Sequence, residues 1–156
     1  MNIIAAKSSD AEEISELIIE LSSPFYISSS REGAETFLAS ICPEAIRGYI
    51  SANNFSYFIA RLDGQLAGVV ALRDNVHLFH LFVAEAFQGR GLATQLWRLV
   101  ETNALQSGNQ GEFTVNSSLN AVPVYERFGF VQEGSIQQIN GILFQPMRIS
   151  TRDNSI

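Results

Sequence analysis

The stretch LFHLFVAEAFQGRGLATQL, residues 78–96, decides how this chain folds. Its first part belongs to an aromatic and β-branched run that predicts a strand, and its last part begins a leucine-rich helical pattern at Leu92. Gly89 and Gly91 lie between the two, and glycine permits both a tight turn and close approach to the backbone. A helix that begins after such a turn presents unpaired amides and a positive dipole end to an anion. The glycines alone leave open a phosphate cradle and a plain strand-to-helix turn.

Outward from this stretch, the sequence predicts a strand, two helices, three strands, a helix, a strand, a helix and two strands. Asp-Gly at 63–64 and Asn-Gly at 140–141 indicate hairpin turns. Ser9 with Glu12 fits a capping box, and Asn120 fits a helix N-cap. The expected strands are residues 2–7, 56–62, 65–72, 76–83, 112–117, 130–139 and 142–150, and the expected helices are residues 8–23, 31–41 with a short continuation over 43–50, 92–107 and 120–128.

Helices interspersed with hairpins in one short chain predict the α+β class. We expect a mixed, mostly antiparallel sheet of six to seven strands flanked by about four helices. The sequence has no internal repeat, low-complexity segment or Pro/Gly-rich linker, so it predicts a single domain over residues 1–150. Residues 151–156 are expected to form a frayed C-terminal tail.

Composition narrows the class of protein. A hydrophobic share of 46% with 17% charged residues is that of a globular domain, and it excludes intrinsic disorder. The net charge of −6, without a basic stripe, argues against a nucleic-acid partner. No apolar run approaches the roughly 20 residues of a membrane span, so we expect a cytoplasmic protein without a membrane partner. Cys42 is the only cysteine, which excludes an intrachain disulfide and a cysteine-based metal cluster, and no metal is expected.

Two motifs in this chain resemble those of one enzyme family. The dinucleotide-binding fingerprint is incomplete, because Thr94 stands where its third glycine belongs. QGRGLA, residues 88–93, instead resembles the Q/R-x-x-G-x-G/A signature of the GNAT superfamily of N-acetyltransferases. VNSSLNAVPVYERFGF, residues 115–130, is similar to the second segment of that family, a strand, an asparagine, a helix, a tyrosine and a Gly-Phe ending. The order of elements also resembles the GNAT fold, whose central strands are splayed apart.

The resemblance implies acetyl-CoA as cosubstrate and direct transfer of its acetyl group to an amine. The strand before the glycines would pair with the pantetheine arm as an added strand, and the amides of residues 88–94 would hold the pyrophosphate. The backbone amide of Val83 is a candidate donor to the thioester carbonyl. The implied cofactor contacts are Leu81, Phe82, Val83, Gln88, Gly89, Arg90, Gly91, Leu92, Ala93, Thr94, Asn120 and Tyr125.

The resemblance also suggests which residues move protons. Tyr125 matches the tyrosine that protonates the departing thiolate, and its ordinary pKa of about 10 keeps it protonated at neutral pH. His77 and His80 are candidates for the base that deprotonates the amine. We prefer His77, which lies eleven positions before Gln88, where several members of the family place a catalytic carboxylate or histidine. Regular alternation puts His80 on the opposite sheet face, unless a β-bulge changes the parity.

The acceptor amine stays unidentified at this stage. In the GNAT family the first two helices, their loop and the last hairpin build the acceptor site, which here are residues 22–37 and 135–144. Phe25, Tyr26 and Phe37 are candidates for an apolar or cation-binding wall. The negative net charge favours a cationic amine such as a polyamine, a lysine or a peptide amino terminus. A non-catalytic acyl-CoA-binding module, a nucleotide-binding protein and a homodimeric state all remain open.

Overall fold

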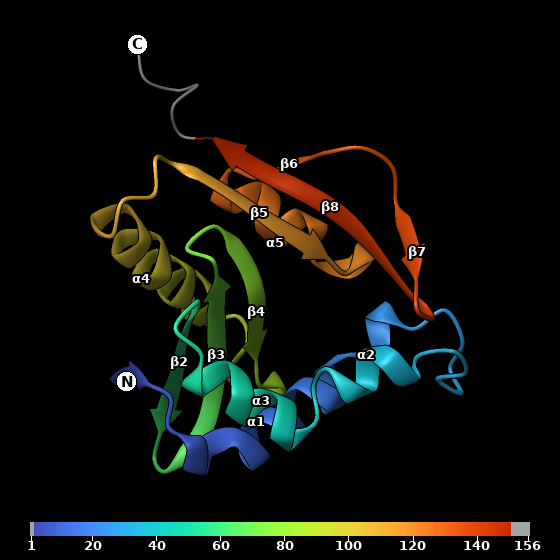
Figure 1. Ribbon diagram of the computed structural model, residues 1–156, viewed down its shortest axis with the longest axis horizontal. Helices are drawn as coiled ribbons and strands as arrows, with labels where there is room; N and C mark the ends of the chain where they lie inside the picture. Colours follow the sequence, from blue (N-terminus) through green and yellow to red (C-terminus); the bar gives the residue numbers. More distant parts are fainter. Residues whose placement is uncertain (1, 151–156) are drawn as a thin grey trace.

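A mixed sheet of eight strands runs through residues 2–150, the part of the chain that the computed structural model describes (Figure 1). The strands follow the order β1-β2-β3-β4-β5-β8-β6, and β7 pairs with β8 beside this path. The strands are β1 (Asn2–Ala5), β2 (Phe55–Leu62), β3 (Gln65–Arg73), β4 (His77–Val83), β5 (Glu112–Ser117), β6 (Val131–Gln132), β7 (Gln137–Ile139) and β8 (Ile142–Ser150). The α-helices are α1 (Ala11–Leu21), α2 (Glu35–Ala39), α3 (Pro43–Ser51), α4 (Leu92–Gln106) and α5 (Val122–Phe128).

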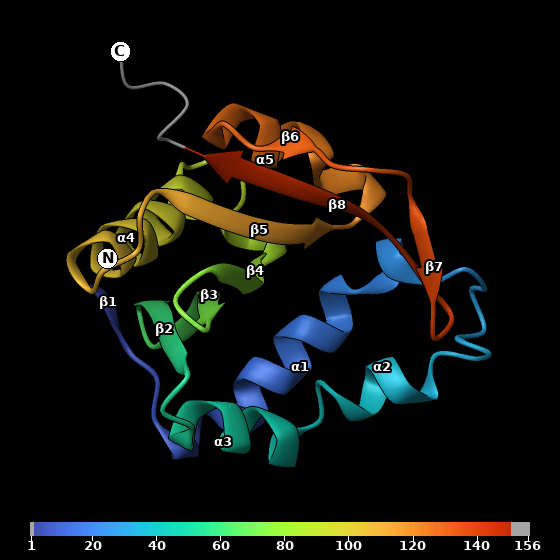
Figure 2. The same cartoon turned by 45° about the horizontal axis from the view of Figure 1, so that its top comes forward.

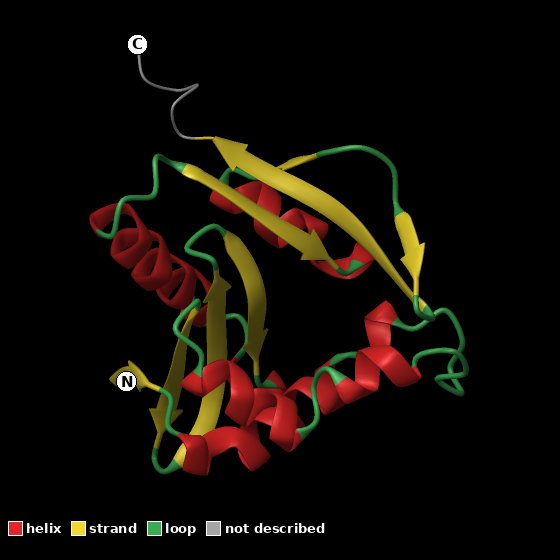
Figure 3. Cartoon of the chain, in the orientation of Figure 1, coloured by secondary structure: helices red, strands yellow, loops and turns green. Residues whose placement is uncertain are grey.

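The predicted α+β class and its mostly antiparallel sheet are confirmed, and Figure 3 shows groups of strands interspersed with helices. The described residues hold one strand more than expected, because residues 130–139 divide into β6 and β7. They also hold one more helix, because Pro43 starts a nine-residue helix of its own. The expectation for residues 151–156 lies outside the described part. No helix within residues 2–150 combines the length and the apolar character needed to cross a membrane.

Two local predictions are wrong. The capping box of Ser9 with Glu12 does not form; instead the carboxylate of Asp10 accepts a hydrogen bond of 2.8 Å from the N–H of Lys7. The reason is that a 3₁₀ turn, Ser8–Asp10, precedes α1 and takes over the capping position. Asn120 is not the N-cap of α5, because it lies inside a second 3₁₀ turn, Leu119–Ala121.

Strand β3 is buried on both faces and separates two hydrophobic cores. On one side α1 and α3 cover the sheet with residues such as Ile14 and Ile46, and on the other side α4 packs with Leu96 and Val100. Figure 2 shows α1 and α3 lying on the opposite side of β2 and β3 from α4. Because a strand covered twice presents no solvent face, β3 reads as a nearly continuous apolar run.

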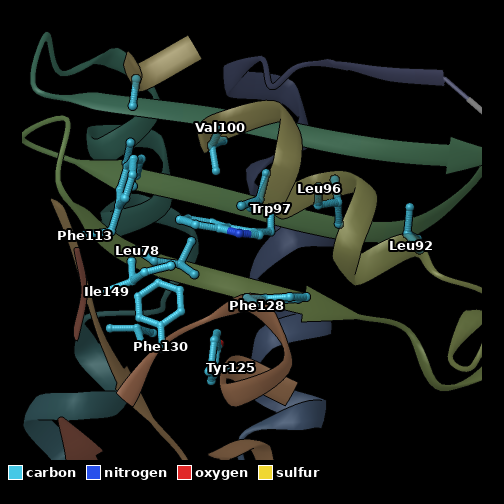
Figure 4. Packing of buried hydrophobic residues seen from close by; sticks show 14 of the residues in the cluster. Leu78, Leu92, Leu96, Trp97, Val100, Phe113, Tyr125, Phe128, Phe130 and Ile149 are labelled. Atoms are coloured by element: carbon cyan, nitrogen blue, oxygen red, sulfur yellow. The ribbon is translucent and has the colours of Figure 1, made fainter. Parts of the chain in front are cut away.

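Trp97 of α4 is the centre of the larger core (Figure 4). Its side chain is fully buried, and the centre of its ring system lies 5.0 Å from that of Phe113, 5.3 Å from Phe130 and 6.1 Å from Phe128. Large aromatic side chains dominate the energetics of such cores. The cluster therefore fixes β5 and the end of α5 against α4.

Strands β4 and β5 separate soon after they meet. Their parallel pairing consists of His77 with Thr114 and Leu78 with Val115, and β4 then continues beside β3 alone. The splayed central strands are thereby confirmed, and Figure 1 shows β5 and β8 diverging from β4. A β-bulge lies at the same place, because Leu72 faces Leu78 while Ala71 faces His80. One edge of β4 is consequently left without a neighbouring strand.

The hairpin of β7 and β8 holds the loop between α1 and α2. The N–H of Ile27 donates to the carbonyl of Gly141 at 3.1 Å, and Tyr26 forms a β-bridge with Ile142. Gly141 has a φ of +76°, and a Cβ built there would lie 2.5 Å from the carbonyl carbon of Gly33. Two glycines thus allow two backbones to touch.

Replacing Gly141 with alanine should break this contact. The left-handed backbone costs an L-residue about 1–2 kcal/mol, and the overlap with Gly33 adds to that loss. Gly64→Ala is the matched control, since Gly64 has a φ of +78° and open space around its Cβ position. Urea unfolding should give Gly141→Ala the larger loss of unfolding free energy. Equal losses in the two variants would contradict the proposed backbone contact.

Candidate functional site

A cleft of about 560 Å³ opens where β4 leaves β5. Its volume falls within the range of roughly 300–1,000 Å³ that is usual for small-molecule sites. The cleft is bounded by β4, the turn after it, the start of α4, the end of β5 and α5. It is lined by all of the predicted cofactor contacts except Arg90: Leu81, Phe82, Val83, Gln88, Gly89, Gly91, Leu92, Ala93, Thr94, Asn120 and Tyr125.

The free edge of β4 offers backbone groups to this cleft. The N–H of Ala84 donates to the carbonyl of Ala67 on β3 at 2.8 Å. Since successive peptide groups of a strand point to opposite sides, the N–H groups of Leu81 and Val83 point away from β3, toward the gap beside β5. The side-chain amide of Gln88 donates to the carbonyl of Val83 at 2.9 Å, and this bond holds the turn against the edge of β4. An extended ligand could pair with β4 here as an additional strand.

The turn after β4 ends in a set of unpaired amides. Gly89 and Gly91 have φ values of +76° and +80°, and a Cβ at either position would meet nothing within 4 Å. The first hydrogen bond of α4 runs from the N–H of Gln95 to the carbonyl of Gly91 at 3.1 Å. The N–H groups of residues 92–94 therefore have no partner within the helix. With the helix dipole they form a cradle for an anion, which is open because Gly89 and Gly91 keep side chains out of it.

Residues that the sequence analysis did not select also line the cleft. Asn116 of β5 and Arg127 of α5 are such residues, whereas Phe25, selected above as a candidate for the acceptor wall, also lines the cleft from the loop after α1. Asn116 gives no distinguishing signal in the sequence, since, like Thr114, it occupies an outward position of an ordinary alternating strand. Arg127 is the one charged side chain on the cleft wall among the described residues. Arg90 points elsewhere, with its guanidinium carbon 5.6 Å from the ring centre of Phe87.

Tyr125 lies in the cleft wall with its ring in the core. It is 7% exposed, and its ring lies 6.0 Å from that of Phe128 and 5.9 Å from that of Phe130. Gly129, with a φ of +107°, ends α5 and lets the N–H of Phe130 reach the carbonyl of Tyr125 at 3.0 Å. Burial raises the pKa of the Tyr125 hydroxyl well above its usual value, so the hydroxyl keeps its proton at neutral pH.

The two histidines lie on the same side of the sheet. The bulge at Phe79, which the sequence analysis allowed as the exception to regular alternation, turns His80 to the same side as His77 and not to the opposite one. Both histidines line a smaller pocket of about 200 Å³, and the rings of Phe79 and His80 lie 4.2 Å apart. Phe25, Leu78, Phe79, Phe82 and Asn116 line both this pocket and the cleft, so the two cavities adjoin at β4.

Both imidazoles are neutral at physiological pH. Burial, with a contribution from Arg73, lowers the pKa of His77 to about 4, and its Nδ1 lies 2.7 Å from the hydroxyl of Thr114. Burial lowers the pKa of His80 to about 3, and its Nδ1 lies 2.7 Å from the Tyr57 hydroxyl. His80 is 7% exposed and occupied by this bond, whereas His77 is only partly buried. Within residues 2–150, no three histidine, cysteine, aspartate or glutamate side chains gather into a group that could hold a metal ion.

The chain is similar to known acetyltransferases. The family model described as acetyltransferase (GNAT) domain matches residues 25–151. A relative, acetyltransferase Atu2258 of Agrobacterium fabrum, is 36% identical over 73 residues, which are 47% of this chain and 53% of that protein. This chain thus spans about half the length of that relative.

Two crystal structures share the fold. A GCN5-related N-acetyltransferase from Rhodopseudomonas palustris superposes with a TM-score of 0.78 and 23% identity, over 96% of this chain and 94% of the other. The PaiA N-acetyltransferase from Thermoplasma acidophilum, solved in complex with coenzyme A, gives 0.76 and 18%, over 94% and 96%. Because the family match extends over most of the chain and the folds agree along nearly its whole length, this protein belongs to the GNAT acetyltransferase family.

Proposed function

We propose that this protein transfers the acetyl group of acetyl-CoA to a primary amine. One observation carries the proposal: the free edge of β4 leads directly into the unpaired amides at the start of α4, with Tyr125 on the wall of the same cleft. The pantetheine arm of acetyl-CoA is extended, carries amides and ends in phosphates, so it matches the order of these groups along the cleft. Acetyl-CoA supplies the acetyl group as a thioester, which is already activated for attack by an amine.

The backbone would do most of the binding. The edge at Leu81 and Val83 pairs with the pantetheine amides, and the amides of residues 89–94 hold the pyrophosphate, since the N–H of Gln88 already donates to the carbonyl of Glu85. Arg90 takes part through its N–H, because its side chain lies over Phe87. Asn120 adds a side-chain amide on the wall of the cleft. A chain of net charge −6 can hold phosphates in this way because the backbone N–H groups bind them locally and do not depend on the net charge of the side chains.

Tyr125 supplies the proton for the leaving sulfur. When the new N–C bond forms and the C–S bond breaks, the departing thiolate takes the proton of Tyr125, and the second proton of the attacking nitrogen returns to Tyr125, which restores its hydroxyl. The raised pKa of Tyr125 means that its hydroxyl is protonated before the reaction and can donate at that moment. The N–H of Val83, directed into the cleft, is our candidate donor to the carbonyl oxygen on which negative charge develops.

His77 accepts the proton of the ammonium, directly or through a water molecule. We choose it ahead of His80 because His80 is almost completely buried and bonded to Tyr57. The neutral imidazole of His77 can receive a proton, although its lowered pKa makes it a weak base. The amine would approach from the smaller pocket, which joins the cleft beside Phe79 and Phe82.

Acetyl-CoA should stabilise the protein, and a side chain at Gly91 should abolish the effect. A ligand at 100 times its Kd adds about 2.7 kcal/mol, or roughly 5–10 °C in Tm for a chain of this size. Gly91→Leu fills the open cradle, whereas Gly64→Leu has the same left-handed backbone far from the cleft. Thermal melting should therefore show the shift in Gly64→Leu and not in Gly91→Leu. No shift in the wild type, or a larger one with a dinucleotide, would refute the proposed function.

Tyr125→Phe should slow turnover with little effect on cofactor affinity. Loss of a general acid costs about 10²–10⁴-fold in kcat, while the phenyl ring retains its packing against Phe128 and Phe130. Tyr26→Phe is the control, because it removes a buried hydroxyl that has no hydrogen-bond partner among the described residues. Release of free thiol measures both variants. Equal kcat values for Tyr125→Phe and the wild type would remove Tyr125 from the mechanism.

The pH–rate profile should contain no histidine titration near neutrality. Because the pKa of His77 is lowered to about 4, it is already deprotonated above about pH 5, and no activity is lost through it as pH falls from 8 to 5. Because His77 takes the proton from the bound ammonium, kcat/KM should stay level from about pH 5 up to the pKa of the acceptor amine. His77→Gln should lower kcat by roughly 10²-fold, the lower end for a general base. An inflection near pH 6.5 that disappears in His77→Gln would contradict the lowered pKa.

A further inference from the structure

The pocket of about 200 Å³ beside the cleft indicates which amines the protein accepts. We propose that the acceptor is a small primary amine carried on an aromatic or bulky aliphatic body, and not a polyamine. This inference rests on the proposed function, since it assigns the smaller pocket to the acceptor. We call it the acceptor pocket; it lies between α2, β4 and β8, next to the edge where β4 and β5 separate.

The walls of the acceptor pocket are mainly aromatic. Five phenylalanines from four separate segments of the chain face it, together with isoleucines of α1, of the residues just after α2 and of β8. The rings of Phe25 and Phe37 lie 5.7 Å apart and form one side. Such walls bury an apolar body well, and their ring faces also attract a single ammonium group. The phenylalanines are Phe25, Phe37, Phe79, Phe82 and Phe144.

The charges around the acceptor pocket exclude a second ammonium. No aspartate or glutamate lines it among the described residues, and both histidines are neutral. Its one charged lining residue is Arg73, whose guanidinium lies over the ring of Phe79 at 5.5 Å and already pairs, at 3.7 Å, with the carboxylate of Asp74, which does not line the pocket. A polyamine would have to bury a further positive charge without a partner and close to a guanidinium, which is strongly unfavourable.

The same walls assist deprotonation of a single amine. An ammonium group that loses its water in an apolar pocket becomes more acidic, because burial disfavours the charged form. The neutral amine is the form that attacks the acetyl carbon. A weak base such as His77 is then sufficient, so the aromatic walls and the lowered pKa of His77 are consistent parts of one site.

The negative charge of the protein does not change this assignment. Four glutamates of the N-terminal region, Glu12, Glu13, Glu16 and Glu20, are exposed on α1 and none of them lines the acceptor pocket. Exposed charges beyond about 10 Å are largely screened at physiological salt. The volume of the acceptor pocket also favours a compact amine, because about 200 Å³ is below the usual range for drug-sized ligands.

The test compares two amines at saturating acetyl-CoA, with free thiol as the readout. We expect kcat/KM for 2-phenylethylamine to exceed that for spermidine by roughly 10- to 100-fold, the effect of burying one aromatic side chain. Melting with acetyl-CoA is measured in parallel on the same protein. If acetyl-CoA binds and spermidine is used as well as or better than 2-phenylethylamine, the inference is overturned and the proposed function stands. If acetyl-CoA neither binds nor releases thiol with any amine, the proposed function itself fails.

Variants of the pocket make the comparison sharper. Phe144→Glu introduces a carboxylate into the acceptor pocket, and it should lower use of 2-phenylethylamine at least tenfold while raising use of spermidine. Phe144→Ala tests the wall without a charge; it should lower use of 2-phenylethylamine and leave spermidine unimproved. Ile139→Glu is the control, on an exposed part of β7 outside the pocket, and should change neither. Unchanged selectivity in both Phe144 variants, with acetyl-CoA binding retained, would overturn the assignment.

Discussion

The separation of β4 from β5 is the constraint on which the rest of this structure depends. Each strand is committed to a different partner: β4 to β3 along its length, and β5 to β8 over Glu112–Ser117. The Trp97 cluster holds β5 against α4 at the same time, and the two strands stay apart beyond the pair of Leu78 and Val115. Unpaired backbone groups are costly unless water or a ligand satisfies them. The site is thus a gap that the packing of both cores keeps open.

A single extra residue organises the chemistry around this gap. The bulge at Phe79 turns His77 and His80 to the same side of the sheet and directs Phe79 and Phe82 between the two cavities. Without it, alternation would place one histidine in the α4 core. Bulges are common beside active sites because they change the direction of side chains without ending the strand.

Local groups, and not the net charge, determine what each cavity can bind. The cradle at the start of α4 offers backbone amides to an anion although the chain carries a charge of −6. The acceptor pocket is aromatic and lacks carboxylates although acidic residues outnumber basic ones by 16 to 10. Burial then acts in both cavities, raising the pKa of Tyr125 and lowering that of His77. Both shifts favour neutral forms, as expected where side chains lose contact with water.

The sequence by itself determined the class of fold, the hairpin turns and the order of strand, glycine turn and helix over residues 81–94. These features depend on near neighbours in the chain. Asp63 and Gly64 both have positive φ, as the Asp-Gly pattern predicts. Only the tertiary structure decided the orientation of His80 and the position of the Phe144 side chain in the same pocket as Phe25 and Phe37. The register of β4 on β3 sets the first, and packing of distant elements sets the second. Neither leaves a periodic signal in the sequence, because both result from how separate elements dock.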